Sequence, residues 1–156
     1  EDLAELESGR YFDARAVDAL KDFIAGARAE GLSVCLSSAY RSYNEQTYLF
    51  NRKVSQCGGD EAAAARIVNR PGTSEHQLGL AVDFAATGKQ SEDFSTTPQS
   101  QWLQENAWRF GFVQSYTEDM VTETNKLARP EHYRYVGPAL ARQLVEEHHT
   151  LKEGTE

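Results

Sequence analysis

The ten residues Ser74-Glu75-His76-Gln77-Leu78-Gly79-Leu80-Ala81-Val82-Asp83 hold a histidine and an aspartate seven positions apart. Residues 80–84 are predicted to form a strand, and Gly79 lets the backbone bend just before it. A turn that feeds a strand can direct His76 and Asp83 to one point, which neither a helix nor a single straight strand does easily. Because imidazole and carboxylate are ordinary ligands of a divalent ion such as zinc, the stretch indicates half of a metal site.

A third ligand is required, because a catalytic zinc keeps three protein ligands and one open position for water. The chain has four histidines. His148 and His149 lie in a polar C-terminal tail, where no specific role is expected. The other one is His132, within Arg129-Pro130-Glu131-His132-Tyr133-Arg134-Tyr135-Val136-Gly137. The predicted metal ligands are therefore His76, Asp83 and His132.

These segments resemble the signatures of VanY-like D-alanyl-D-alanine carboxypeptidases, which are zinc peptidases with a LAS-type fold. Residues 74–83 fit S-x-H-x-x-G-x-A-x-D at every fixed position, and residues 132–137 resemble the end of E-P-W-H-[FY]-R-Y-V-G. Ala39-Tyr40-Arg41-Ser42 is similar to a third family segment, S-G-Y-R-S. The resemblance implies one Zn²⁺ per chain and hydrolysis of the terminal D-alanine, D,D- or L,D-, of peptidoglycan stem peptides.

The resemblance also implies roles for three polar residues. Arg41 would hold the peptide and stabilise charge at the scissile carbonyl. Ser74 would bind the terminal region of the substrate, and Gln46 would line the same pocket. The residues alone allow other interpretations: Arg41 as a solvated charge at a strand end, Ser74 as a turn cap, and Gln46 as an exposed helix residue. Both sets stay open.

The general base is where the chain departs from the family pattern. In the family a glutamate stands three residues before the last histidine, but here that residue is Arg129, and Glu131 stands where the family has tryptophan. Glu131 is the candidate base, although an extended chain would turn it away from zinc unless Pro130 introduces a turn. The alternatives are Glu118, Asp119 and Glu123. If no carboxylate serves, the chain is a catalytically silent relative that binds zinc and cell-wall peptide.

The composition of the chain limits which kinds of partner it can bind. The chain has 156 residues, with 16 Lys and Arg against 24 Asp and Glu, a net charge of -8 that argues against nucleic acid and anionic membrane surfaces. No apolar run approaches the roughly 20 residues that span a bilayer, and the first residues do not resemble a signal peptide. We expect a monomer that works outside the cytoplasm, with a signal or anchor before residue 1, as the family implies.

The two cysteines, Cys35 and Cys57, have two interpretations. An even count in an extracytoplasmic protein suggests a disulfide, whereas two free buried thiols are the alternative. Neither residue has the C-x-x-C spacing of a metal ligand pair.

Apolar spacing predicts a single α+β domain, with a small, mainly antiparallel central sheet and helices packed against it. Residues 1–11 are expected to be a polar arm and residues 12–151 the peptidase domain. Asp13, Asp60 and Thr97 are the expected helix N-caps, and Gly31 and Gly111 are the expected stops. The predicted helices cover residues 14–30, 43–56, 60–68, 98–110 and 138–148, and the strands cover residues 32–38, 80–84, 112–116 and 133–136. Residues 87–97 are expected to be a surface loop, and residues 117–129 a polar excursion.

Overall fold

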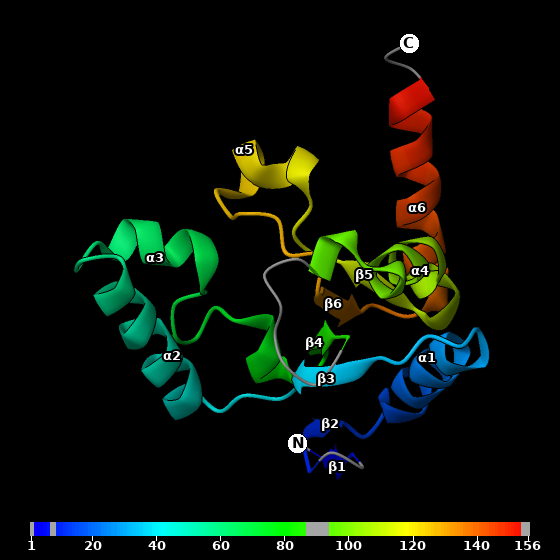
Figure 1. Cartoon of the computed structure of the whole chain (residues 1–156), viewed down its shortest axis with the longest axis horizontal. Helices are drawn as coiled ribbons and strands as arrows, with labels where there is room; N and C mark the ends of the chain where they lie inside the picture. The colour runs from blue at the N-terminus through cyan, green and yellow to red at the C-terminus, as the bar shows by residue number, and fades with distance from the viewer. Residues whose placement is uncertain (1, 7–8, 87–93, 154–156) are drawn as a thin grey trace.

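A four-stranded antiparallel sheet lies at the centre of the chain, in a computed structural model that describes residues 2–6, 9–86 and 94–153, except the side chains of Glu123 and of residues 148–153. The strand order is β3-β4-β6-β5 (Figure 1). These strands are β3 (Cys35–Ser38), β4 (Ala81–Ala85), β5 (Phe112–Gln114) and β6 (His132–Tyr135). A separate hairpin pairs β1 (Leu3–Glu5) with β2 (Tyr11–Asp13). The predicted α+β architecture is confirmed.

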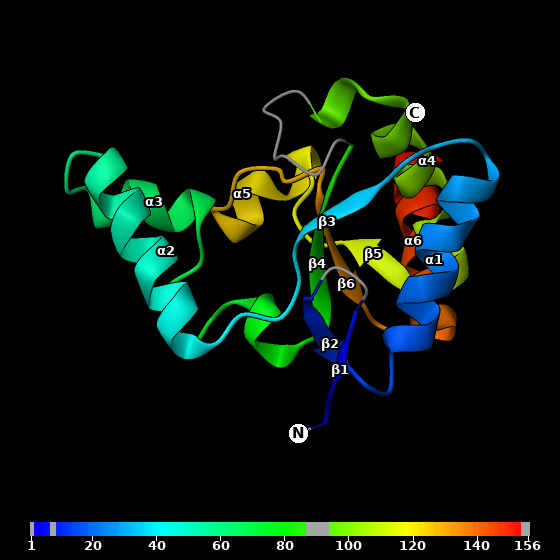
Figure 2. The ribbon, with the colours of Figure 1, turned by 60° about the horizontal axis from the view of Figure 1, so that its bottom comes forward.

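The helices form two groups at opposite ends of the long axis, with the sheet between them (Figures 1 and 2). One group contains α1 (Val17–Ala29), α4 (Pro98–Asn106) and α6 (Pro138–Glu153), and the other contains α2 (Tyr43–Gln56) and α3 (Glu61–Ile67). Shorter turns are η1 (Glu75–Leu78), η2 (Phe94–Thr96), η3 (Ala107–Phe110), η4 (Glu118–Met120) and α5 (Val121–Thr124). In the described ranges, no helix is both long and apolar enough to cross a membrane.

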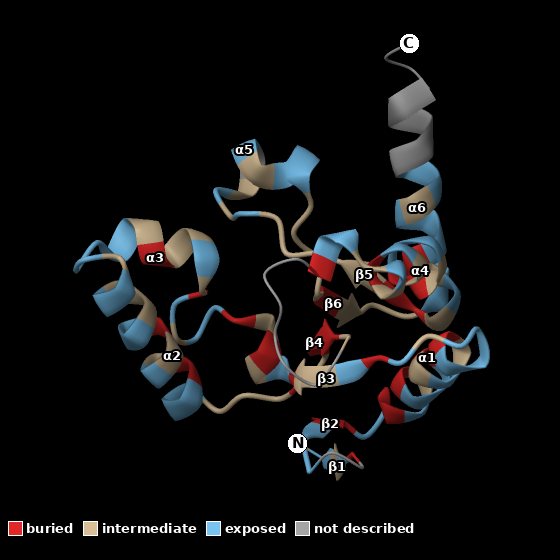
Figure 3. Cartoon of the chain, viewed as in Figure 1, coloured by how far each residue is buried: buried red, intermediate tan, exposed pale blue. Residues whose placement is uncertain are grey.

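One face of the sheet forms the hydrophobic core, because side chains alternate between the two faces of each strand. Phe23 of α1 lies at its centre, with its ring 5.4 Å from that of Phe84, 5.0 Å from Phe112 and 6.0 Å from Tyr133. All four side chains are buried. Figure 3 colours β4 and the first part of β6 as buried. Burial of each side chain stabilises the fold by roughly 1.5–3 kcal/mol. This face therefore holds the sheet against the helices, and polar residues can lie on the other face.

The start of α1 differs from the prediction. Ala16 is the N-cap, without a side-chain bond, and Asp13 is instead the last residue of β2. The Asp13 carboxylate accepts hydrogen bonds from the backbone nitrogen of Arg15 at 2.8 Å and from its guanidinium at 2.7 Å. A local partner thus takes the oxygen that was expected to cap the helix. The predicted caps Asp60 and Thr97 are confirmed, since each side chain accepts from a backbone nitrogen three residues on.

The chain ends are more regular than the sequence suggests. Leu3–Glu5 is paired with β2, and Leu6 is buried in the core, so these residues of the predicted arm pack against the domain. The expected limit of the arm, residue 11, falls inside β2. The closing helix continues to Glu153 and includes His148 and His149. Of the loop expected at residues 87–97, residues 87–93 lie outside the described part and Phe94–Thr96 forms η2.

Cys35 and Cys57 are free thiols, so the disulfide interpretation is wrong for this structure. Cys35 begins β3, whereas Cys57 caps the far end of α2. A 14-residue helix spans about 21 Å at 1.5 Å per residue, and α2 leads away from the sheet (Figure 2). A disulfide requires Cα atoms within about 7 Å. Cys35 and Cys57 lie on consecutive elements of the chain, but they are therefore not close together in space.

Gly111 ends η3 and provides a test of the fold. Its φ is +85°, and an added Cβ would lie 2.8 Å from the Tyr135 ring and 3.0 Å from the backbone of Gly137 and Pro138. We expect Gly111→Ala to lower the free energy of unfolding by more than the roughly 1–2 kcal/mol that the left-handed conformation alone costs. Gly58→Ala is the matched control, because Gly58 has φ +67° and nothing within 4 Å. Equal losses in thermal melts would contradict the packing argument.

Candidate metal centre and active site

Asp83 and His132 lie directly opposite each other on β4 and β6. The core-facing neighbours Phe84 and Tyr133 point to one face of the sheet, so Asp83 and His132 share the other face. His132 Nδ1 lies 2.9 Å from Asp83 Oδ1, and both side chains are buried. The register of two strands therefore forms two thirds of the predicted cluster.

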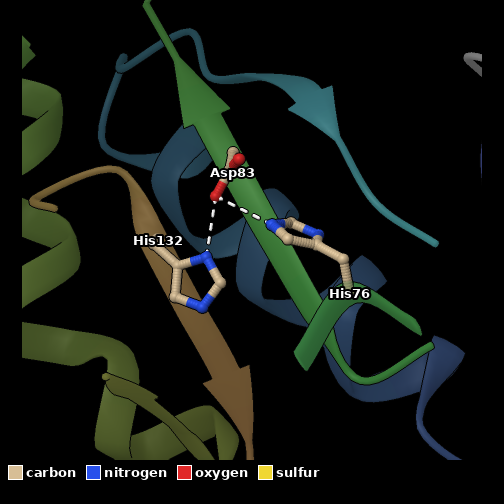
Figure 4. Close-up of side chains that lie close together, drawn as sticks. All are labelled: His76, Asp83 and His132. Carbon is tan, nitrogen blue, oxygen red and sulfur yellow. Dashed lines mark hydrogen bonds and ion pairs between the residues drawn. The ribbon is translucent and has the colours of Figure 1, made fainter. Parts of the chain in front are cut away.

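His76 reaches the same oxygen from η1. Ser74 is the N-cap of this turn, where its hydroxyl accepts a hydrogen bond from the His76 nitrogen at 3.3 Å. Gly79, with φ +73°, ends the turn just before β4. His76 Nε2 lies 3.2 Å from Asp83 Oδ1 (Figure 4). The structure thus brings the three predicted ligands together, with their ligand atoms all within 4.8 Å of one another.

The outer nitrogen of each imidazole has an acceptor that assigns its tautomer. His76 Nδ1 lies 2.7 Å from the Ala39 carbonyl oxygen, which can only accept, so Nδ1 carries the hydrogen and Nε2 a lone pair. His132 Nε2 lies 2.8 Å from Glu75 Oε2, which leaves the lone pair on Nδ1. Two lone pairs and a carboxylate oxygen therefore converge on one point. A divalent cation satisfies this donor set.

His76 Nε2 supports the same assignment. This buried atom makes no hydrogen bond within the described residues, although Asp83 Oδ1 is at ion-pair distance. Burial lowers the pKa of His76, which favours the neutral ring that binds metals. At His132 burial also lowers the pKa, but the carboxylates of Asp83 and Glu75 outweigh it and raise the value. A proton on His132 is thus the alternative occupant of the point where a cation fits.

Glu75 is a functional candidate that the sequence analysis missed. Besides His132, its carboxylate accepts a hydrogen bond from Ser115 Oγ at 2.7 Å, and Arg134 lies 3.4 Å away. Burial would raise the pKa of Glu75, but the hydrogen bonds from His132 and Ser115 and the charges of His132 and Arg134 lower it to about 2. The sequence offers one indication of a role for Glu75, which is its position directly before the predicted ligand His76. Its role depends on a strand that lies 57 positions further along the chain.

Glu75→Gln is expected to weaken zinc binding by about 10- to 100-fold, the usual effect of removing a partner behind a metal-bound histidine. The amide keeps an acceptor for His132 Nε2 but removes the negative charge that makes the ring a better ligand. Zinc titration against a competing chelator measures the change. Glu118→Gln, at an exposed position on η4, is the matched control. Equal affinities of both variants and the parent chain would show that Glu75 does not support the site.

Arg41 is held on the site side by three contacts. Its Nε donates to Ser38 Oγ at 2.8 Å, Nη1 to Gln46 Oε1 at 3.3 Å and Nη2 to Asp83 Oδ2 at 3.1 Å. Gln46 is fully buried, and its Nε2 donates to the Asn69 carbonyl at 2.8 Å. Arg41 is therefore not a solvated strand-end charge, and Gln46 is not an exposed helix residue. Gln46 positions Arg41.

Arg129 occupies the place in the chain where the family signature has glutamate. Its Nη2 lies 3.1 Å from Asp83 Oδ2, and its Nε lies 3.3 Å from Glu131 Oε1. Burial lowers the pKa of Arg129, but Asp83 and Glu131 outweigh it and raise the value. Asp83 thus has one oxygen facing two imidazoles and the other facing two guanidiniums. Although burial raises its pKa, these partners hold the pKa well below the ordinary value.

Glu131 lies on the cavity side because the chain turns at Pro130. The His132 nitrogen donates to the Arg129 carbonyl at 3.1 Å, and β6 begins only at His132. The turn interpretation of this segment is therefore confirmed over the extended one. Among the other candidate bases, Glu118 and Asp119 are exposed on η4, and the Glu123 side chain lies outside the described part.

A cavity of about 480 Å³ adjoins the cluster, within the range of roughly 300–1,000 Å³ that small ligands occupy. Arg41, Arg129 and Glu131 line it beside residues of α2 and α3 and of the segment 127–131. This segment is tied to α3, because the Leu127 nitrogen donates to the Arg66 carbonyl at 3.0 Å and Lys126 Nζ donates to the Ala65 carbonyl. Ser74 and Gln46 are absent from the lining, so their contact with a substrate stays a prediction.

Residues 9–138 match the family model described as D-alanyl-D-alanine carboxypeptidase, VanY. A D-alanyl-D-alanine carboxypeptidase of Enterococcus faecalis is 36% identical over 159 residues, which cover 97% of this chain and 58% of that protein. The chain spans about half the length of the curated relatives of this kind.

Solved structures share the fold. VanYB in complex with D-alanine-D-alanine is 37% identical, with a TM-score of 0.84 over 94% of this chain and 83% of that one. A mutant of the vancomycin resistance D,D-pentapeptidase VanY in complex with Zn(II) is also 37% identical, with a TM-score of 0.82 over 92% of this chain and 83% of that one.

Proposed function

Because this chain belongs to the VanY family of D-alanyl-D-alanine carboxypeptidases, we propose that it is a zinc-dependent carboxypeptidase that removes the terminal D-alanine, D,D- or L,D-, from peptidoglycan stem peptides. The observation that carries the proposal is the convergence of His76, Asp83 and His132 on one point. Family membership and the zinc bound by a related VanY structure support the choice of metal.

His76, Asp83 and His132 would hold one zinc ion per chain. When bound, zinc would lower the pKa of a water molecule towards about 7 and polarise a peptide carbonyl. The Ala39 carbonyl and Glu75 fix the orientation of the two imidazoles. Because these outer contacts are already made, the ligands need little rearrangement when the metal arrives.

Arg41 and Arg129 would bind the negative charge of the substrate. Both guanidiniums face Asp83 Oδ2 and both line the cavity. Their forked donors suit a peptide carboxylate or the charge that develops on a carbonyl oxygen. Gln46 holds Arg41 in place, whereas Ser74 shapes the turn that carries His76. A related structure that contains D-alanine-D-alanine supports a peptide end as the ligand.

Glu131 would serve as the general base in place of the family glutamate. Its carboxylate lines the cavity, and the Arg129 guanidinium joins it to the Asp83 carboxylate. It would take the proton of the attacking water and return it to the leaving amine of D-alanine. The C–N bond breaks, and the products are free D-alanine and a peptide shorter by one residue.

Membership of the family also supports the extent of the catalytic domain and its location relative to the cytoplasm. Residues 12–151 would form the peptidase domain, and a cell-wall peptide as substrate would require it to act outside the cytoplasm. The test is to load the protein with one equivalent of zinc and to measure D-alanine release from a peptide that ends in D-Ala-D-Ala and from one that ends in L-Ala-D-Ala. Release that requires zinc is expected. Binding of both peptides without release would replace the proposal with a silent peptide-binding relative.

A further inference from the structure

Two cations on the cavity wall have no part in the chemistry proposed above. Arg52 and Lys53 line the cavity from the second half of α2. Arg41 and Arg129 line the part of the same cavity that adjoins Asp83, and Glu131 is the one carboxylate in its described lining. The whole chain carries a net charge of -8, so this positive wall opposes the charge of the molecule.

Arg52 and Lys53 also lack the partners that the other two cations have. Arg41 and Arg129 each contact the Asp83 carboxylate at 3.1 Å. Across the described ranges, neither Arg52 nor Lys53 forms an ion pair with a carboxylate. A lysine near a helix C-terminus can simply stabilise the helix dipole. Arg52 and Lys53, however, both line the cavity, where an anionic ligand would meet them.

The other residues that line the cavity indicate what the rest of the ligand is like. Apart from Gln56 they are aliphatic, and the aliphatic side chains are Leu49, Ile67, Val68, Leu127 and Ala128. Leu127 is 41% exposed and Ile67 38% exposed, so apolar surface is available to a ligand. A peptide with small aliphatic residues between two negative groups complements this combination of apolar surface and separated positive charge.

The spacing along α2 sets the distance between the two negative groups. Gln46 contacts Arg41, and Lys53 lies seven residues later, which corresponds to about 10 Å at 1.5 Å per residue. An extended peptide covers about 3.3–3.6 Å per residue, so about three residues fit this distance. We propose that Arg52 and Lys53 form a second anion-binding subsite, which selects peptides with a side-chain carboxylate about three residues before the terminal D-alanine and disfavours a cationic side chain there.

This inference rests on the proposed function, and its test uses three acetylated peptides, X-Ala-D-Ala-D-Ala, in which X is glutamate, glutamine or lysine. For the zinc-loaded parent chain we expect kcat/KM to fall in that order, by about tenfold between glutamate and lysine, since one peptide gains an attraction and the other meets a repulsion. The change should lie mainly in KM. Because the subsite is open to solvent, added salt should reduce the preference.

The double variant Arg52→Gln/Lys53→Gln is expected to reduce the preference to within about twofold, with the glutamine peptide processed as before. Lys21→Gln/Arg28→Gln, at exposed positions on α1 at the other end of the molecule, removes the same net charge and should leave the preference intact (Figure 2). Melting temperatures of both variants separate a helix-stabilising role from a ligand-binding one.

The outcomes separate this inference from the proposed function. Equal kcat/KM for the three peptides, or an unchanged preference in the Arg52/Lys53 variant, would overturn the subsite and leave the carboxypeptidase proposal standing. If no peptide is hydrolysed, calorimetric binding of the same three peptides to the zinc-loaded protein decides the question. Tighter binding of the glutamate peptide, lost only in the Arg52/Lys53 variant, would support the subsite in a silent relative, and equal binding would exclude it.

Discussion

The His132→Ala protein is expected to retain far less than one equivalent of zinc and to release no measurable D-alanine. The substitution removes one of the three ligand atoms that converge beside Asp83 Oδ1. It also leaves the Glu75 carboxylate, which is largely enclosed, without its hydrogen bond from His132 Nε2. The loss of zinc affinity should therefore exceed the 10- to 100-fold expected when only an outer partner such as Glu75 is changed.

Metal analysis after dialysis against a weak chelator measures this effect directly. His76→Ala should behave in the same way, because its Nε2 faces the same oxygen. His148→Ala is the matched control, since it removes a histidine from α6, which belongs to the helix group at the far end of the molecule from α2 (Figure 1). One full equivalent of zinc in both the His76 and the His132 variants would exclude the assigned cluster.

The strand pattern around Asp83 shows how much of the site was predictable. Val82 and Phe84 are apolar neighbours of Asp83, and their alternation places the carboxylate on the face away from the core. A fixed pattern that contains His76 and Asp83 then indicates the ligand type. The pairing of β4 with β6 is a long-range contact that no local pattern specifies. His132 is predicted as a ligand because it is the remaining histidine outside the tail and because residues 132–137 resemble a family segment.

Residues whose role depends on distant partners were placed less well. The sequence allows Gln46 to line the pocket or to be exposed on a helix. In the structure it is buried, and its amide is hydrogen-bonded to the Asn69 carbonyl and to Arg41. Glu75 was overlooked because its partner lies on β6. Asp13 is predicted to cap α1 but does not, since the side chain of the nearby Arg15 hydrogen-bonds to its carboxylate. Local propensity predicts which atoms need partners, but tertiary structure decides which partners they find.

Glu131→Gln is expected to leave zinc bound and to reduce D-alanine release by about 10² to 10⁴, the usual contribution of a general base. The amide has nearly the shape of the carboxylate and can still accept a hydrogen bond from Arg129, but it cannot take the proton of water. Single-turnover release from a D-Ala-D-Ala peptide, with zinc content measured on the same samples, checks both parts. Glu118→Gln is the control for a carboxylate on exposed η4. Equal release by the parent chain and Glu131→Gln would place the base elsewhere.

A second variant, at Arg129, tests whether the general base can act from the position that the family uses. Arg129 stands three residues before His132, where the family has its glutamate. Arg129→Glu in the Glu131→Gln background returns a carboxylate to that position and removes one of the two guanidiniums from Asp83 Oδ2. If position 129 can direct a base at the metal centre, part of the lost activity should return, whereas Arg129→Gln in the same background should return none.

If the parent chain binds peptide without hydrolysis and only the Arg129→Glu variants release D-alanine, Glu131 is not a base and the natural chain is a silent relative. Activity of the parent chain that falls in Glu131→Gln would instead mean that the carboxylate has moved two positions along the chain, across the turn at Pro130, while the metal ligands stayed in place.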